Sequence, residues 1–114
     1  MLFRSAVMGL VSRIQPVFSI SYHSYSEIVI YPYGCDGQRA EDRQVVEGLG
    51  RQLAGKLVKD SGSGTYDPGT SWELLYAVDG GDIDWYHNAE HVIPYVIEVN
   101  SGSQGFQQIG RAHV

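Results

Sequence analysis

The 114-residue chain has little cysteine, little positive charge and no long apolar run, and each shortage excludes a class of protein. Cys35 is the only cysteine, so no disulfide can form within the chain. A single cysteine does not indicate whether the protein works in an oxidising or a reducing compartment. The 8 basic residues against 13 acidic ones give a net charge of −5, which argues against a nucleic-acid-binding surface. No apolar stretch reaches the length of a membrane-spanning helix. The length allows one globular domain at most.

The two ends of the chain match translated sequencing-adapter DNA. Residues 109–114 are what the DNA ATCGGAAGAGCACACGTC encodes, and Leu2-Phe3-Arg4-Ser5 is what CTCTTCCGATCT encodes. We therefore predict that residues 1–5 and 109–114 derive from adapter, and that the natural sequence covers residues 6–107.

Apolar patterning predicts strands that alternate with helices. Runs of β-branched and aromatic residues predict strands, whereas apolar residues at helical spacing predict helices. The expected strands cover 17–22, 27–31, 72–76 and 92–99, and the expected helices cover 6–14, 40–59 and 82–88. Strands joined by a long helix favour an α/β fold, with parallel neighbours in the sheet and helices on its faces.

The longest predicted helix, 40–59, has an apolar stripe and terminal charges that suit the helix dipole. Glu41 and Asp42 fall in its expected first turn, and Lys56 and Lys59 fall in its last. The stripe consists of Val45, Val46, Leu49, Leu53 and Leu57. A stripe of this kind packs against the face of a sheet.

Glu98 is the most informative single residue, because it ends an otherwise apolar run over 92–97. Such a run predicts a buried strand, and ionised carboxylates are rarely buried without a partner. General-base chemistry would explain a carboxylate at this place. Pairing with a structural cation would explain it as well, although few cations lie nearby in the sequence.

Two segments carry a distinctive order of motifs. The first, Tyr22-His23-Ser24-Tyr25-Ser26, leads to Ile30-Tyr31-Pro32-Tyr33-Gly34. The second begins at Tyr76 and continues through Gly80-Gly81 and Asp84-Trp85 to Glu98. In order and spacing they resemble the zinc metallocarboxypeptidases of the carboxypeptidase A type, over residues 6–107. The resemblance implies a partial carboxypeptidase catalytic domain: a mixed parallel and antiparallel sheet flanked by helices, as a fragment of an α/β/α sandwich.

The resemblance also implies hydrolysis of C-terminal peptide bonds with a Zn2+ cofactor. That family holds zinc through a His-x-x-Glu pair and a later His, and His23 matches the later His. Zinc lowers the pKa of a bound water to about 7. Glu98 matches the glutamate that activates this water and then passes a proton to the leaving amine. His87 and His91, at i and i+4, match no ligand position and are expected on the surface or in loop packing.

Four further residues match substrate-contacting positions of the family: Tyr76, Ser24, Tyr25 and Ile83. Tyr76 corresponds to a mobile tyrosine that closes over the substrate, and Ser24 and Tyr25 to residues that line the cleft. Ile83 corresponds to the base of the specificity pocket, where an apolar side chain implies apolar or aromatic C-terminal residues. Asp79 and Asp82 lie close to Ile83 in the sequence. Their carboxylates could instead favour a substrate with a basic C-terminal residue, so both specificities remain open.

The family carries non-proline cis peptide bonds near its active site. By resemblance, the candidate bonds here are Ser24–Tyr25, Pro32–Tyr33 and Asn100–Ser101. We predict that at least one of the three is cis.

Large parts of the family pattern are absent. No His-x-x-Glu pair precedes His23, and the arginine that stabilises the oxyanion and the Asn-Arg pair that binds the terminal carboxylate also belong upstream. Catalytic zinc needs about three protein ligands. We therefore expect this polypeptide alone to have no peptidase activity.

Two other functions remain open. An inactive relative could keep the scaffold as a binding domain, and a glycosidase could use Asp84 and Glu98 as a carboxylate pair about 5–10 Å apart. The resemblance implies peptide or protein C-termini as partners, without nucleic acid or membrane. It also implies a monomer at full length and an extracellular, secreted location.

Overall fold

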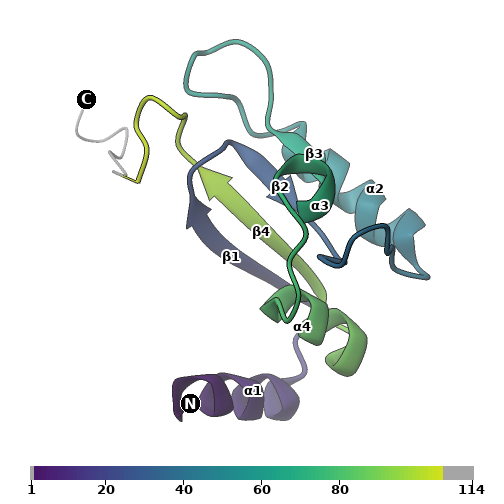
Figure 1. Cartoon of the computed structure of the whole chain (residues 1–114). Helices are drawn as coiled ribbons and strands as arrows, with labels where there is room; N and C mark the ends of the chain where they lie inside the picture. Colours follow the sequence, from purple (N-terminus) through teal and green to yellow (C-terminus); the bar gives the residue numbers. More distant parts are fainter. Residues whose placement is uncertain (1, 107–114) are drawn as a thin grey trace.

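The computed structural model describes residues 2–106 as a mixed sheet with helices on both faces (Figure 1). Its four strands stand in the order β1-β4-β2-β3. β4 runs parallel to β1 and antiparallel to β2, and β2 runs parallel to β3. The elements are α1 (Leu2–Ile14), β1 (Phe18–Ser24), β2 (Ile28–Ile30), α2 (Arg43–Ala54), β3 (Asp67–Gly69), α3 (Ser71–Leu74), α4 (Asp82–Glu90) and β4 (Ile93–Val99). The predicted fold class, a mixed sheet flanked by helices, is confirmed.

The sheet separates two apolar cores, because successive side chains on a strand point to opposite faces. On the face covered by α2, Val29 and Tyr95 of the sheet pack with Val46 of the helix. On the other face, Val96 packs with Ile83 of α4. The central strands β2 and β4 are therefore buried on both sides, which explains their continuous apolar runs.

Helix α2 is shorter than predicted, and it turns a different face to the sheet. It covers Arg43–Ala54, so the acidic and basic residues expected in its end turns lie outside it. Val45 and Leu49 are exposed, whereas Val46, Glu47, Gly50 and Ala54 are buried. The predicted stripe was therefore wrong in part. The helix lies close to the sheet through Gly50, since a Cβ there would stand 2.7 Å from Tyr31 Cδ2.

The segment predicted as a strand over 72–76 is instead the short helix α3, and that prediction was wrong. A capping box begins the helix: the Glu73 carboxylate accepts hydrogen bonds from the Thr70 amide at 2.9 Å and the Thr70 hydroxyl at 3.1 Å. This reciprocal capping satisfies donors at the helix start, and it outweighs the strand preference of the aromatic residues nearby. The β3 strand just before it was not predicted.

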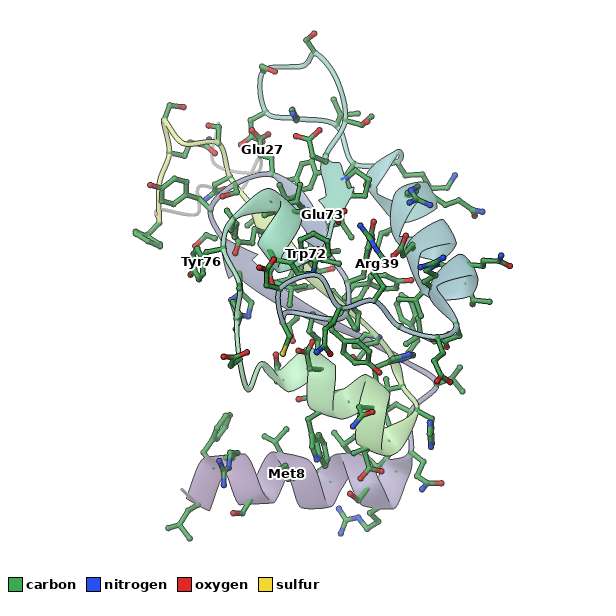
Figure 2. The ribbon with its side chains drawn as sticks, turned by 45° about the vertical axis from the view of Figure 1, so that its right-hand side comes forward. Met8, Glu27, Arg39, Trp72, Glu73 and Tyr76 are labelled. Carbon is green, nitrogen blue, oxygen red and sulfur yellow. The ribbon has the colours of Figure 1, made fainter. Side chains whose placement is uncertain are left out.

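Arg39 links α3 to α2 through ion pairs with both helices (Figure 2). Its guanidinium lies 2.8 Å from Glu47 of α2, pairs with Glu73 of α3, and stacks 5.1 Å from the centre of the Trp72 ring. Arg51 also reaches Glu47, at 3.1 Å. The buried Glu47 carboxylate thus has two cationic partners, as a buried charge requires.

Helix α1 lies beside α4, at a distance from the sheet (Figure 1). The prediction of a helix over 6–14 is confirmed, although the helix extends back to Leu2. None of its residues is buried, and the Ser12 hydroxyl donates to Glu90 of α4 at 2.6 Å. No helix within residues 2–106 has both the length and the apolar character needed to cross a membrane.

Candidate active site

His23 and Glu98 lie side by side on neighbouring strands. In the parallel pairing of β1 with β4, His23 is the direct partner of Glu98. Neighbouring strands stand about 4.8 Å apart, and paired positions of two parallel strands point to the same face. The sheet therefore brings together an imidazole and a carboxylate that stand 75 positions apart in the chain, as the difference 98 − 23 shows.

Glu98 has no ion-pair partner among residues 2–106, and no hydrogen bond holds its carboxylate there. Its side chain is partly buried near the end of β4. The alternative in which a structural cation neutralises Glu98 thus has no support in this part of the chain. A partly desolvated carboxylate without a partner remains available for a proton-transfer role.

His23 is exposed, and its surroundings alone do not make a metal site. Within residues 2–106, no group of three or more His, Cys, Asp or Glu side chains could hold a metal ion. Catalytic zinc needs about three protein ligands. The described residues therefore fit zinc only in part: His23 can serve as one ligand, and the others would have to come from elsewhere.

His87 and Glu90 stand at His-x-x-Glu spacing, which the sequence analysis did not consider, but His87 is engaged elsewhere. Its Nδ1 lies 2.7 Å from the Val92 carbonyl and its Nε2 lies 2.8 Å from the Asp42 carboxylate. Because a carbonyl oxygen only accepts, Nδ1 is the donor in the first contact. His87 is buried, so packing explains its position, whereas His91 is exposed. Neither histidine belongs to a metal-binding cluster formed by residues 2–106.

Ile83 lies on the same face of the sheet as Glu98. Only 6% of the Ile83 residue is exposed, and it packs in a cluster with Ile28, Ile30 and Val96. Val96 precedes Glu98 by two positions, so both side chains point to this face, opposite to α2. The structure thus places an apolar cluster next to the His23–Glu98 pair.

Tyr76 follows α3 and points outward on the connection to α4 (Figure 2). With 69% of it exposed, it contributes little to the core. This exposure fits a side chain that is free to change position. Within residues 2–106, no hydrogen bond or ion pair joins Tyr76 to His23 or Glu98.

Ser24 and Tyr25 continue the chain directly after His23. Ser24 pairs with Val99, and the Tyr25 ring meets Phe106 edge-on with 5.0 Å between centres. The Ser24–Tyr25 and Pro32–Tyr33 peptide bonds are cis, which confirms the prediction that at least one candidate is. The third candidate, Asn100–Ser101, is not among the cis bonds of the described residues.

A cluster of hydrogen bonds that the sequence did not predict surrounds Gly34. The Asp84 carboxylate accepts the Gly34 amide hydrogen at 3.0 and 2.9 Å, and the Gly34 carbonyl accepts from the Val78 amide at 2.9 Å. The Cys35 thiol donates to Asp79 at 3.2 Å, and this hydrogen bond raises the pKa of the thiol. Burial raises the pKa of Asp84, and the charges of Asp82 and Asp79 add to it, against the lowering effect of the Gly34 amide.

Comparisons with known proteins identify the family. The sequence profile of the family described as zinc carboxypeptidase matches residues 4–110. The chain is 30% identical over 81 residues to zinc carboxypeptidase A 1 of Anopheles gambiae, which covers 70% of this chain and 18% of that protein. It is also 30% identical over 91 residues to a zinc carboxypeptidase of Simulium vittatum, with 77% of this chain and 30% of that protein covered.

A solved structure agrees with this relation. Bovine thrombin-activatable fibrinolysis inhibitor, in complex with tick carboxypeptidase inhibitor, superposes with a TM-score of 0.78 at 26% identity. The match covers 92% of this chain and 36% of that one. The chain thus spans less than two fifths of the length of each of these three proteins. The family consists of hydrolases that use Zn2+, and by the match over residues 4–110 the chain belongs to this zinc carboxypeptidase family.

Proposed function

We propose that the chain supplies the C-terminal part of the catalytic domain of a zinc-dependent carboxypeptidase, which removes residues from the C-termini of peptides. The observation that carries the proposal is the direct pairing of His23 with Glu98, a carboxylate without an ion-pair partner in residues 2–106. Family membership supports the same chemistry. The carboxylate-pair glycosidase has no comparable support, since the Asp84 carboxylate is engaged by the Gly34 amide.

Glu98 is the general base of this proposal. Its carboxylate takes a proton from the attacking water and then gives it to the nitrogen of the leaving amino acid. His23 would hold zinc through a ring nitrogen, together with ligands from outside residues 2–106. Zinc, when bound, supplies the Lewis acidity that polarises the scissile carbonyl. The pairing of β1 with β4 keeps the two side chains on one face of a hydrogen-bonded sheet, which fixes their relative position.

The remaining proposed roles concern the substrate. Ile83 forms the base of an apolar specificity pocket, which favours apolar or aromatic C-terminal residues, because burial of such a side chain contributes about 1.5–3 kcal/mol. Tyr76 closes over the bound substrate, and Ser24 and Tyr25 line the cleft on the amino-terminal side. The same family relation leads us to propose an extracellular protein that acts as a monomer at full length.

This segment alone is proposed to be inactive, because it contributes one zinc ligand of about three. The purified 114-residue chain should therefore release no phenylalanine from a peptide that ends in Phe, with or without added zinc. A full-length protein that contains the segment should release it, and removal of zinc by a chelator should stop the reaction. If the full-length protein binds zinc and C-terminal peptides without cleaving them, the inactive binding-domain alternative is correct instead.

A further inference from the structure

The connection between α3 and α4, residues 75–81, carries Tyr76 and is tied to a second segment of the chain. The Val78 amide donates to the Gly34 carbonyl at 2.9 Å, and Asp79 accepts from the Cys35 thiol at 3.2 Å. Both hydrogen bonds end on residues 34 and 35, which follow β2. The position of the Tyr76 connection therefore depends on where Gly34 lies.

Gly34 is in turn held from its other side by Asp84. Both carboxylate oxygens of Asp84 lie within hydrogen-bond distance of the Gly34 amide, at 3.0 and 2.9 Å. The backbone of Val78 also lies close to Gly34, because a Cβ added to Gly34 would stand only 2.5 Å from the Val78 carbonyl oxygen. Only glycine allows this approach of two backbones. Gly34 thus links a side chain of α4 to the backbone of the connection.

We propose that Asp84 is a positioning residue for Tyr76: by holding the Gly34 amide, it sets where the connection that carries Tyr76 meets the sheet. The proposal rests on the proposed function only in the use it gives Tyr76, the closing of the site over substrate. The position of the connection itself can be measured without any substrate.

Asp84 is well placed for such a role. It stands in the first turn of α4, where a carboxylate is favoured by the helix dipole. Its neighbour Ile83 anchors the same turn in the apolar cluster on the sheet, so the carboxylate is fixed relative to β2 and β4. The hydrogen-bonded residue Val78 is only two positions from Tyr76 in the chain. The Tyr76 side chain itself is exposed. The base of the connection is therefore held while its tyrosine stays free to move.

Two measurements on the full 114-residue chain test the proposal: hydrogen exchange at the Val78 amide, and the rate at which a thiol reagent labels Cys35. Labelling is unambiguous because Cys35 is the only cysteine. The variants are Asp84→Ala and Asp84→Asn, and Asp82→Ala is the control, since it removes an acidic group from the same helical turn. Far-ultraviolet circular dichroism establishes that each variant is folded.

Asp84→Ala should raise both rates about fivefold or more, because loss of one hydrogen bond of ordinary strength changes an opening equilibrium by that order. Asp84→Asn keeps one acceptor oxygen but loses the charge of the carboxylate, so it should raise both rates by a smaller factor than Asp84→Ala does. Asp82→Ala should match the wild type. If Asp84→Ala fails to fold, an increase in Asp84→Asn over Asp82→Ala decides in favour of the proposal.

Rates in the Asp84 variants that equal those of Asp82→Ala would overturn the proposal. Neither measurement involves zinc or peptide, so a failure of the proposed carboxypeptidase function would leave these rates unchanged. Conversely, the full-length enzyme could be active while Val78 exchange and Cys35 labelling do not change in the Asp84 variants. That result would support the proposed function and refute the positioning role of Asp84.

Discussion

Two glycines in one helix predict opposite effects of the same substitution to alanine. Gly48 and Gly50 both lie within α2, where alanine is favoured over glycine by about 1 kcal/mol. A Cβ on Gly48 would meet nothing within 4 Å. A Cβ on Gly50 would stand 2.7 Å from Tyr31 Cδ2 and 3.0 Å from Tyr95 Cε1. Both tyrosines are buried, so their rings cannot turn aside into solvent.

The sizes of the helix-propensity gain and of the overpacking cost decide whether each variant is more or less stable than the wild type. Gly48→Ala gains the helix preference and should stabilise the fold by about 0.5–1 kcal/mol. Gly50→Ala gains the same preference but overpacks the core, which costs about 1–3 kcal/mol. The net effect of Gly50→Ala should therefore be destabilisation by about 1 kcal/mol, with a gap between the two variants of about 1–3 kcal/mol.

Urea unfolding followed by circular dichroism measures the difference, because the unfolding midpoint moves with the free energy of unfolding while the slope stays constant. The control is built into the pair, since both variants change glycine to alanine in the same helix. A Gly50→Ala variant as stable as Gly48→Ala would refute the reasoning, and with it the close packing of α2 on Tyr31 and Tyr95.

Further predictions concern Glu73 and His87. Burial raises the pKa of Glu73, but its bonds with Thr70 and Arg39 outweigh this and lower it overall. A lowered native pKa stabilises the fold at neutral pH, and the gain is lost as pH falls through that pKa. Glu73→Gln should therefore flatten the acid limb of stability measured against pH, and an unchanged limb would contradict the capping role. His87→Ala should cost about 1–3 kcal/mol of unfolding free energy, since it leaves the buried Val92 carbonyl without its donor. The exposed Asn88→Ala on the same helix should stay within about 0.5 kcal/mol in the same urea titration, and equal losses would count against the His87 contacts.

Local patterns predicted the strands β1, β2 and β4 and the helices α1, α2 and α4, and they missed β3 and α3. The aromatic residues around Trp72 favoured a strand, although Thr70 and Glu73 already have the spacing of a capping box that begins a helix. Helix α2 was predicted too long because its apolar stripe continues to Leu57, whereas the helix ends at Ala54 with Gly55 as its C-cap. The stripe also misplaced the buried face, because Gly50 is the position that lies against Tyr31 and Tyr95.

The candidate site was predictable as far as motifs in the sequence define it. Motifs predicted His23 and Glu98 as site residues, whereas their direct pairing in the sheet could not be predicted from patterns along the chain. The contacts of Gly34 with Val78 and Asp84 join segments 44 and 50 positions apart, as 78 − 34 and 84 − 34 show. No periodicity or propensity indicates such contacts, because they depend on how the segment after β2 meets α4 and the connection before it in space.

The role of Glu98 is the central claim, and one substitution tests it most directly. Glu98→Gln keeps the size of the side chain and its place opposite His23, but removes the carboxylate that accepts a proton. In a full-length protein that contains this segment, kcat for release of a C-terminal phenylalanine should fall by about 10²–10⁴-fold, with zinc content unchanged. An enzyme with Glu98→Gln that keeps its zinc and its wild-type kcat would contradict the account.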